Sequence, residues 1–147
     1  MSEKSTLSRP RFTWPIRVYW EDTDAGGVVY YANYLKFLER ARTEWLSALG
    51  LEQDRLAEEA GVVFVVRRVE ADYLRPARFN DRLGVDCELA SLSRVSLTMI
   101  QRVWRGEEVL LEGGVKVVCV DRSAFRPARI PEFVMRAFET GMRWISP

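Results

Sequence analysis

The chain has 147 residues, 48% of them hydrophobic, and a formal net charge of +1. This length predicts a single domain whose core needs no disulfide or metal for stability, and the small net charge argues against a protein that coats nucleic acid. Histidine is absent, which excludes Ser-His-Asp and Cys-His triads and histidine-bound zinc.

The first third of the chain changes from a strand pattern to a helix pattern. Residues 1–11 are polar and predict a flexible N-terminus ahead of one domain at 12–147. Aromatic and β-branched residues at 12–20 predict a strand. A polar, turn-rich loop follows at 21–27. From 28 to 49 apolar residues recur every three or four positions, which predicts one long helix with a single apolar face.

The rest of the chain is dominated by strand-like segments. A short polar helix is predicted at 52–60, and a second helix at 131–145, which begins with a proline. The turns between the four strand-like segments are too short for helical crossovers, so we expect an antiparallel meander. These segments are 62–74, 83–92, 95–105 and 109–121.

Together the elements predict an α+β domain in which a sheet of five antiparallel strands curls around the long helix. One helix covers only one sheet face, and the edge strands need protection, so we expect a homo-oligomer. The spacing of Cys87 and Cys119 is not that of a metal site, and we expect both to be buried thiols in a reducing compartment. No segment resembles a signal peptide or a membrane span, and we expect a soluble, cytoplasmic protein that binds no metal.

Residues 21–42 combine the features of a reactive site. They read EDTDAGGVVYYANYLKFLERAR: a loop rich in carboxylates, two glycines and the start of a helix. Gly26 and Gly27 permit unusual backbone angles and leave amide groups uncovered. The unpaired N–H groups at a helix start can stabilise an oxyanion. A carboxylate facing such amides is a minimal apparatus for acyl transfer that needs no histidine.

The same segment resembles the 4-hydroxybenzoyl-CoA thioesterase family, and most closely its Tol–Pal-associated acyl-CoA thioesterase branch. The matching signature runs from Val18 through Glu21-Asp22-Thr23-Asp24-Ala25-Gly26-Gly27-Val28-Val29-Tyr30 to Ala32-Asn33-Tyr34 and Glu39-Arg40-Ala41-Arg42-Thr43. Later segments also resemble the family, namely Phe64-Val65-Val66-Arg67, Tyr73-x-x-Pro76-Ala77-Arg78 and Val117-Val118-Cys119-Val120-Asp121.

The resemblance implies a hotdog fold, dimers or tetramers with active sites between subunits, and an acyl-CoA substrate. No cofactor is implied, because CoA is part of the substrate. The family's catalytic aspartate falls on Asp24, as nucleophile or as general base on a water. The backbone N–H that polarises the thioester carbonyl falls on Tyr31. The Tol–Pal branch commonly has histidine there, and a tyrosine side chain is a poor base at neutral pH.

Other residues have weaker predicted roles, and a second function stays open. Gly26, Gly27 and Val28 form the turn that we expect to contact substrate, and Arg94 is a candidate for binding the CoA phosphates because it lies in an exposed turn. Asp24 could also be a turn or cap residue. A non-catalytic acyl-binding or scaffolding oligomer of the same fold is the alternative function. A hotdog hydratase is disfavoured, because it usually relies on a histidine.

Overall fold

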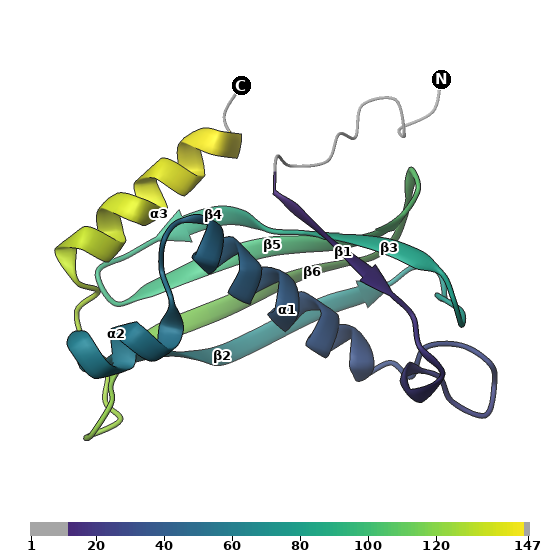
Figure 1. The fold of residues 1–147 in the computed structure, drawn as a ribbon, viewed down its shortest axis with the longest axis horizontal. Helices are drawn as coiled ribbons and strands as arrows, with labels where there is room; N and C mark the ends of the chain where they lie inside the picture. The colour runs from purple at the N-terminus through teal and green to yellow at the C-terminus, as the bar shows by residue number, and fades with distance from the viewer. Residues whose placement is uncertain (1–11, 146–147) are drawn as a thin grey trace.

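The computed structural model describes residues 12–145, and the predicted flexible segment 1–11 lies outside this range. One antiparallel sheet dominates these residues (Figure 1). Its six strands are β1 (Thr13–Arg17), β2 (Val62–Tyr73), β3 (Arg82–Asp86), β4 (Glu88–Leu92), β5 (Ser96–Arg105) and β6 (Glu108–Asp121). The helices are α1 (Asn33–Ala48), α2 (Gln53–Glu59) and α3 (Glu132–Ile145).

Helix α1 lies across one face of the sheet, as the predicted apolar face requires (Figure 1). The side chains of Tyr34, Leu38, Ala41 and Trp45 are buried against the strands. The helix ends as expected before Gly50, whose φ of +83° is the left-handed conformation that favours glycine after a helix. Its start differs from the prediction, because it begins at Asn33 rather than near residue 28.

The strand order corrects the predicted meander. The order is β1-β3-β5-β6-β2, so β2 pairs with β6 and not with β3, the next strand in sequence. The connection at 74–81 crosses the end of the sheet, where the N–H groups of Leu74 and Arg75 both donate to the Leu110 carbonyl at 2.8 and 3.1 Å. Antiparallel pairing was predicted correctly, whereas the placement of β2 was not.

The predicted strand at 83–92 is divided into β3 and β4 around Cys87, which gives six strands instead of five. Side chains replace backbone pairing at the break. The Asp86 carboxylate accepts the Arg102 N–H at 2.7 Å, and Gln101 Nε2 donates to the Asp86 carbonyl at 3.2 Å. Both Asp86 and Gln101 are fully buried. At the interruption, hydrogen bonds of the Asp86 and Gln101 side chains therefore take the place of backbone pairing between β3/β4 and β5.

Helix α3 confirms the predicted C-terminal helix and closes one end of the core. Its Phe138 ring is stacked on Trp45 of α1, with the ring centres 5.6 Å apart, and contacts Phe64 of β2 edge-on. None of the helices within residues 12–145 is long and apolar enough to cross a membrane.

Candidate active site

Asp24 lies at the tip of a tight hairpin in the loop between β1 and α1. Thr23 and Val29 form a bridge across the hairpin, and the Asp24 N–H donates to the Val28 carbonyl at 2.9 Å. The Gly26 N–H donates to Asp24 Oδ1 at 2.8 Å, while the Gly27 N–H donates to the Asp24 carbonyl at 3.0 Å. The turn thus fixes one carboxylate oxygen of Asp24.

The two glycines are needed for the shape of this turn. Gly27 has a φ of +81°, which other residues adopt at a cost. A Cβ at Gly26 would lie 3.2 Å from Asp24 Oδ1, which would crowd the carboxylate. Asp24 is exposed, and its Oδ2 has no hydrogen bond to the side chains described for residues 12–140 or to the backbone of residues 12–145. This oxygen is therefore available to a reactant.

Tyr31 lies in the turn just before α1, two residues before the helix begins. Its carbonyl accepts the Tyr73 hydroxyl at 3.0 Å, and the Asn33 N–H donates to the Tyr30 carbonyl at 2.8 Å. Within the described part of the chain the Tyr31 N–H has no acceptor. An amide hydrogen held at a helix start without a partner can bind a developing oxyanion.

The electrostatics connect Asp24 to the tyrosines. The rings of Tyr30 and Tyr31 lie 4.9 Å apart. The pKa of Tyr30 is raised by its hydrogen bond with Tyr31, with a smaller contribution from the Asp24 carboxylate. The Tyr30 phenol therefore stays protonated at neutral pH.

Asp22 and Asn33 hold the base of the loop. Asp22 is buried, and its Oδ2 accepts the Tyr19 N–H at 2.8 Å. Its carbonyl accepts the Tyr30 N–H and Asn33 Nδ2, both at 2.9 Å. These contacts give both residues a structural role and leave neither Asp22 oxygen group as exposed as the carboxylate of Asp24.

The segment 76–81 supports the loop from the other side. The Val29 N–H donates to the Ala77 carbonyl at 2.9 Å, and Val28 forms a bridge with Arg78. The Ala77 N–H donates in turn to the hydroxyl of Tyr34, a buried residue of α1, at 2.9 Å. Loop, segment and helix therefore form one connected unit around Tyr31.

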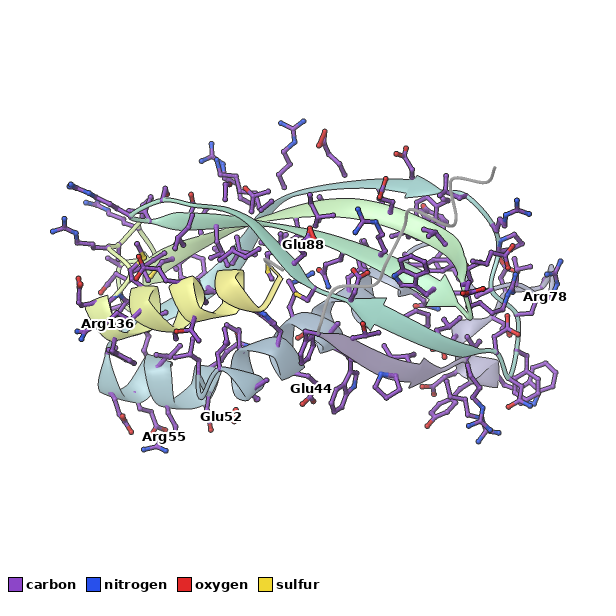
Figure 2. All side chains as sticks on the ribbon, turned by 90° about the horizontal axis from the view of Figure 1, so that it is seen from above. Glu44, Glu52, Arg55, Arg78, Glu88 and Arg136 are labelled. Atoms are coloured by element: carbon purple, nitrogen blue, oxygen red, sulfur yellow. The ribbon has the colours of Figure 1, made fainter. Side chains whose placement is uncertain are left out.

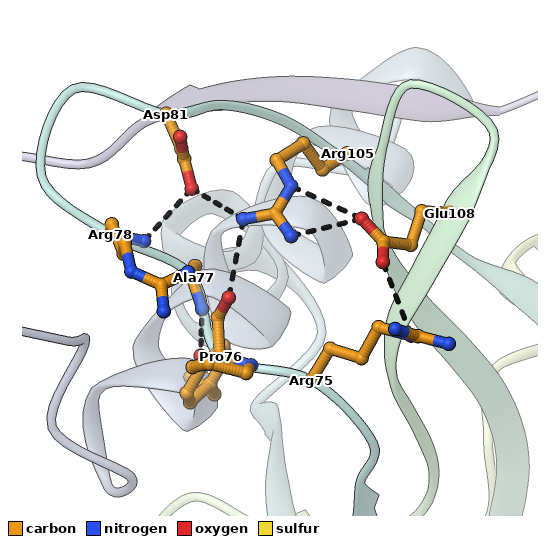
Figure 3. Close-up of polar contacts among 8 residues, drawn as sticks. Arg75, Pro76, Ala77, Arg78, Asp81, Arg105 and Glu108 are labelled. Atoms are coloured by element: carbon orange, nitrogen blue, oxygen red, sulfur yellow. Dashed lines mark hydrogen bonds and ion pairs between the residues drawn. The ribbon is translucent and has the colours of Figure 1, made fainter.

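Arg105 of β5 anchors that segment (Figure 3). Its Nη1 donates to Asp81 Oδ2 at 2.8 Å and to the Pro76 carbonyl at 3.2 Å. Glu108 holds the other side of the guanidinium, with Nη2 2.9 Å from its Oε1. Asp81 also accepts the Arg78 N–H at 2.8 Å. The two carboxylates raise the pKa of Arg105, Asp81 more than Glu108.

A hollow of 270 Å³ opens beside Tyr31. Val29, Tyr34, Tyr73 and Pro76 contribute to its walls. Burial raises the pKa of Tyr34 and of Tyr73, so both phenols remain neutral there. The unpaired amide thus borders a largely aromatic recess that can receive an acyl group.

Arg94 does not join this unit within one chain. It lies in the turn between β4 and β5, where its carbonyl accepts the Ile130 N–H at 2.8 Å. Its pocket neighbours are residues 129–132 and Met135, at the start of α3. Figure 2 shows Arg78, the partner of Val28, at one end of the molecule and Arg136 of α3 at the other. The structure therefore separates Arg94 from Asp24 in a single subunit.

Comparison with known proteins identifies the family of this chain. The family model of the thioesterase-like superfamily matches residues 18–138, which include the loop, α1 and all of the sheet except β1. The chain belongs to the thioesterase-like superfamily. This membership confirms the family resemblance and the α+β hotdog fold expected from the sequence.

Relatives of this superfamily member align with nearly the whole domain. The acyl-CoA thioester hydrolase YbgC of Escherichia coli O157:H7 is 46% identical over 129 residues, which are 87% of this chain and 96% of the relative. The acyl-CoA thioesterase YbgC of Haemophilus influenzae is 44% identical, covering 86% and 93%. The solved structure of TT1821 from Thermus thermophilus is 35% identical with a TM-score of 0.83, covering 89% and 99%.

Sequence reasoning missed the residues that support the site of this thioesterase-family chain. Tyr73, Pro76 and Arg78 were noted only as part of a family signature, and Arg105 was not singled out. The short distance in sequence between Asp24 and the helix start made the loop recognisable. Arg105 is 24 residues from Asp81 and 29 from Pro76, and no local pattern predicts contacts over such separations.

Proposed function

We propose that the chain hydrolyses acyl-CoA thioesters to a carboxylic acid and free CoA, with Asp24 and the Tyr31 N–H as the reacting groups. The free oxygen of Asp24 and the unpaired amide at the start of α1 carry this proposal, because one rigid loop presents both. The names of the YbgC relatives support the reaction class.

In the first route, Asp24 acts as a general base. It takes a proton from water while the water oxygen attacks the thioester carbonyl carbon, and the carbonyl oxygen becomes an oxyanion. The Tyr31 N–H donates to that oxyanion. The intermediate then collapses, the C–S bond breaks, and the CoA thiolate leaves and takes up the proton from Asp24, which restores the carboxylate.

In the second route, Asp24 acts as the nucleophile. Its free oxygen attacks the carbonyl carbon and expels the CoA thiolate, which gives an acyl-aspartate anhydride. Water then hydrolyses the anhydride and restores the carboxylate. The same amide serves the oxyanion in both routes, so the proposal of Asp24 and Tyr31 does not depend on which route applies.

We propose further that the working enzyme is a cytoplasmic homodimer or homotetramer whose sites lie between subunits. The outer edge of β2 has no strand partner among residues 12–145, and Val69 of this strand is exposed. A second subunit could bring its Arg94 near this loop, and the free state of both cysteines suits a reducing compartment.

The test is hydrolysis of a panel of acyl-CoAs by the purified protein and by Asp24→Asn. We expect the variant to keep the fold and oligomer but to lose kcat/KM by about a thousandfold, because it lacks the group that starts the chemistry. Glu21→Gln removes an exposed acid of the same loop and serves as the matched control. Normal turnover by Asp24→Asn would contradict the mechanism, and acyl-CoA binding without turnover by the wild type would favour the non-catalytic alternative.

A further inference from the structure

A second pocket lies between the C-terminal half of α1, the sheet and α3. Its volume is 170 Å³. Three aromatic rings form part of its walls, those of Trp45, Phe64 and Phe138, and Leu97 and Met99 of β5 lie beneath them. Apolar cavities of about 150 Å³ hold a benzene ring. The pocket therefore has the size and lining to accept one aromatic ring.

Arg42 places a positive charge at the side of this apolar space. Its Nη1 donates to Gln101 Oε1 at 2.9 Å, which fixes the guanidinium. That is one hydrogen bond for a group with five N–H donors, and Arg42 has no ion pair with the side chains described for residues 12–140. Burial lowers the pKa of Arg42, although a guanidinium keeps its charge.

Glu39 lies at the rim of the same pocket but does not pair with Arg42. Its Oε2 accepts the Thr43 hydroxyl at 2.6 Å, along its own helix. Arg42 thus keeps N–H donors that can bind a ligand carboxylate. The nearby Glu39 carboxylate would repel a ligand that carries more than one negative charge. A ligand with a single carboxylate is therefore favoured over phosphate or a dicarboxylate.

We propose that this pocket binds an aromatic monocarboxylate, with its ring among Trp45, Phe64 and Phe138 and its carboxylate on Arg42. This inference goes beyond the proposed hydrolysis, because it requires neither a thioester nor Asp24. The ligand class is the same as that released when an aromatic acyl-CoA is hydrolysed. Arg42 lies nine residues after the start of α1, which corresponds to roughly 14 Å along the helix. The pocket is therefore separate from the Asp24 loop, which lies before the helix start.

Calorimetric titration of the full-length protein with benzoate tests the proposal directly. We expect saturable binding of benzoate, at least tenfold weaker binding of the neutral isostere benzamide, and no binding of inorganic phosphate. Absence of benzoate binding, or equal affinity for benzamide, would overturn the proposal without the use of any variant.

Two arginine variants on the same helix locate the site. Arg42→Gln should weaken benzoate binding by at least tenfold, whereas Arg40→Gln, the exposed control, should leave it unchanged. Val66→Phe adds bulk at the half-exposed pocket wall and should also reduce affinity. Unchanged affinity in both Arg42→Gln and Val66→Phe would refute this site. Asp24→Asn should bind benzoate as the wild type does, so a failure of the hydrolysis mechanism and a failure of this site give different results.

Discussion

Asp86 is a carboxylate buried inside the sheet at the break between β3 and β4. It accepts the Arg102 N–H and the Trp104 indole N–H, both at 2.7 Å. Burial raises the pKa of Asp86 to about 6 from an ordinary value of 3.8, even though these hydrogen bonds and the charge of Arg102 oppose the shift. The folded state therefore holds this proton more tightly than the unfolded state does.

This difference predicts a loss of stability as pH rises. Well below pH 4 the carboxyl is protonated in both states and contributes no pH dependence. Between about pH 4 and 6 the unfolded state ionises first, so the folded state loses stability, and above pH 6 the loss is complete. It amounts to roughly 3 kcal/mol, since one pKa unit corresponds to about 1.4 kcal/mol.

Urea unfolding of the wild type and of Asp86→Asn from pH 4 to pH 7 measures the effect. The stability advantage of the wild type over the variant should shrink by roughly 2 kcal/mol across this range, since the unfolded carboxyl is already partly ionised at pH 4. Asp72→Asn removes an exposed carboxylate of β2 and is the control, whose difference from the wild type should stay constant. A constant difference for Asp86→Asn as well would contradict the prediction.

At the scale of residues, sequence reasoning identifies groups whose geometry is set locally. The turn of Asp24, Gly26 and Gly27 follows from neighbouring residues, and the structure shows that turn. Asp86 gave no such signal, because a single acid in an apolar strand looks like a solvent-facing residue. Its burial depends on Trp104 and Arg102, which belong to another strand.

At the scale of elements, the connection between β2 and β3 supports the loop that contains Asp24. Arg105 holds it through Pro76 and Asp81, and the connection holds the loop through the pairing of Val29 with Ala77. We expect Arg105→Gln to lower kcat by about tenfold with little change in KM. A shift of the Tyr31 amide weakens stabilisation of the transition state more than binding of the substrate.

The matched control is Arg102→Gln, on the same strand. Arg102 pairs with Glu112 at 2.7 Å and has no hydrogen bond or ion pair to segment 76–81. Both variants should lower the melting temperature, but only Arg105→Gln should lower kcat. Equal kcat values for the two variants would show that Arg105 stabilises the fold without positioning the site.

The elements themselves were predictable wherever one apolar period continued over many residues. The buried face of α1 follows the three-to-four spacing of Tyr34, Leu38, Ala41 and Trp45. The start of α1 was placed too early, because Val28 and Val29 continue the apolar pattern although they pair with Arg78 and Thr23. The neighbour of β2 depends on pairing across nearly fifty residues, about which the local pattern says nothing.

At the scale of the whole molecule, β2 is a long strand at the edge of the sheet. Its outer edge has no partner within residues 12–145, and Val69 is 39% exposed on it. An unpaired apolar edge favours association with another strand. We expect light scattering to give two or four times the chain mass of 17.0 kDa for the wild type. Val69→Lys should shift the protein towards the monomer, because it places a charge on this edge.

Val95→Lys is the control for the added charge, since Val95 is similarly exposed but lies in the turn between β4 and β5. It should keep the oligomer of the wild type. A monomeric wild type, or an unchanged oligomer in Val69→Lys, would contradict association through this edge. If the sites are shared between subunits, the monomeric variant should also lose hydrolysis.

The crossing of segment 76–81 over the end of the sheet has a consequence for biosynthesis. A ribosome releases the Asp24 loop early, but the groups that hold this loop, Ala77 and then Arg105, emerge much later. Strand β2 likewise has no strand partner until β6 has been translated. The nascent chain therefore lacks the groups that support the Asp24 loop until most of its length is outside the exit tunnel, and its strand edges stay unpaired during that interval.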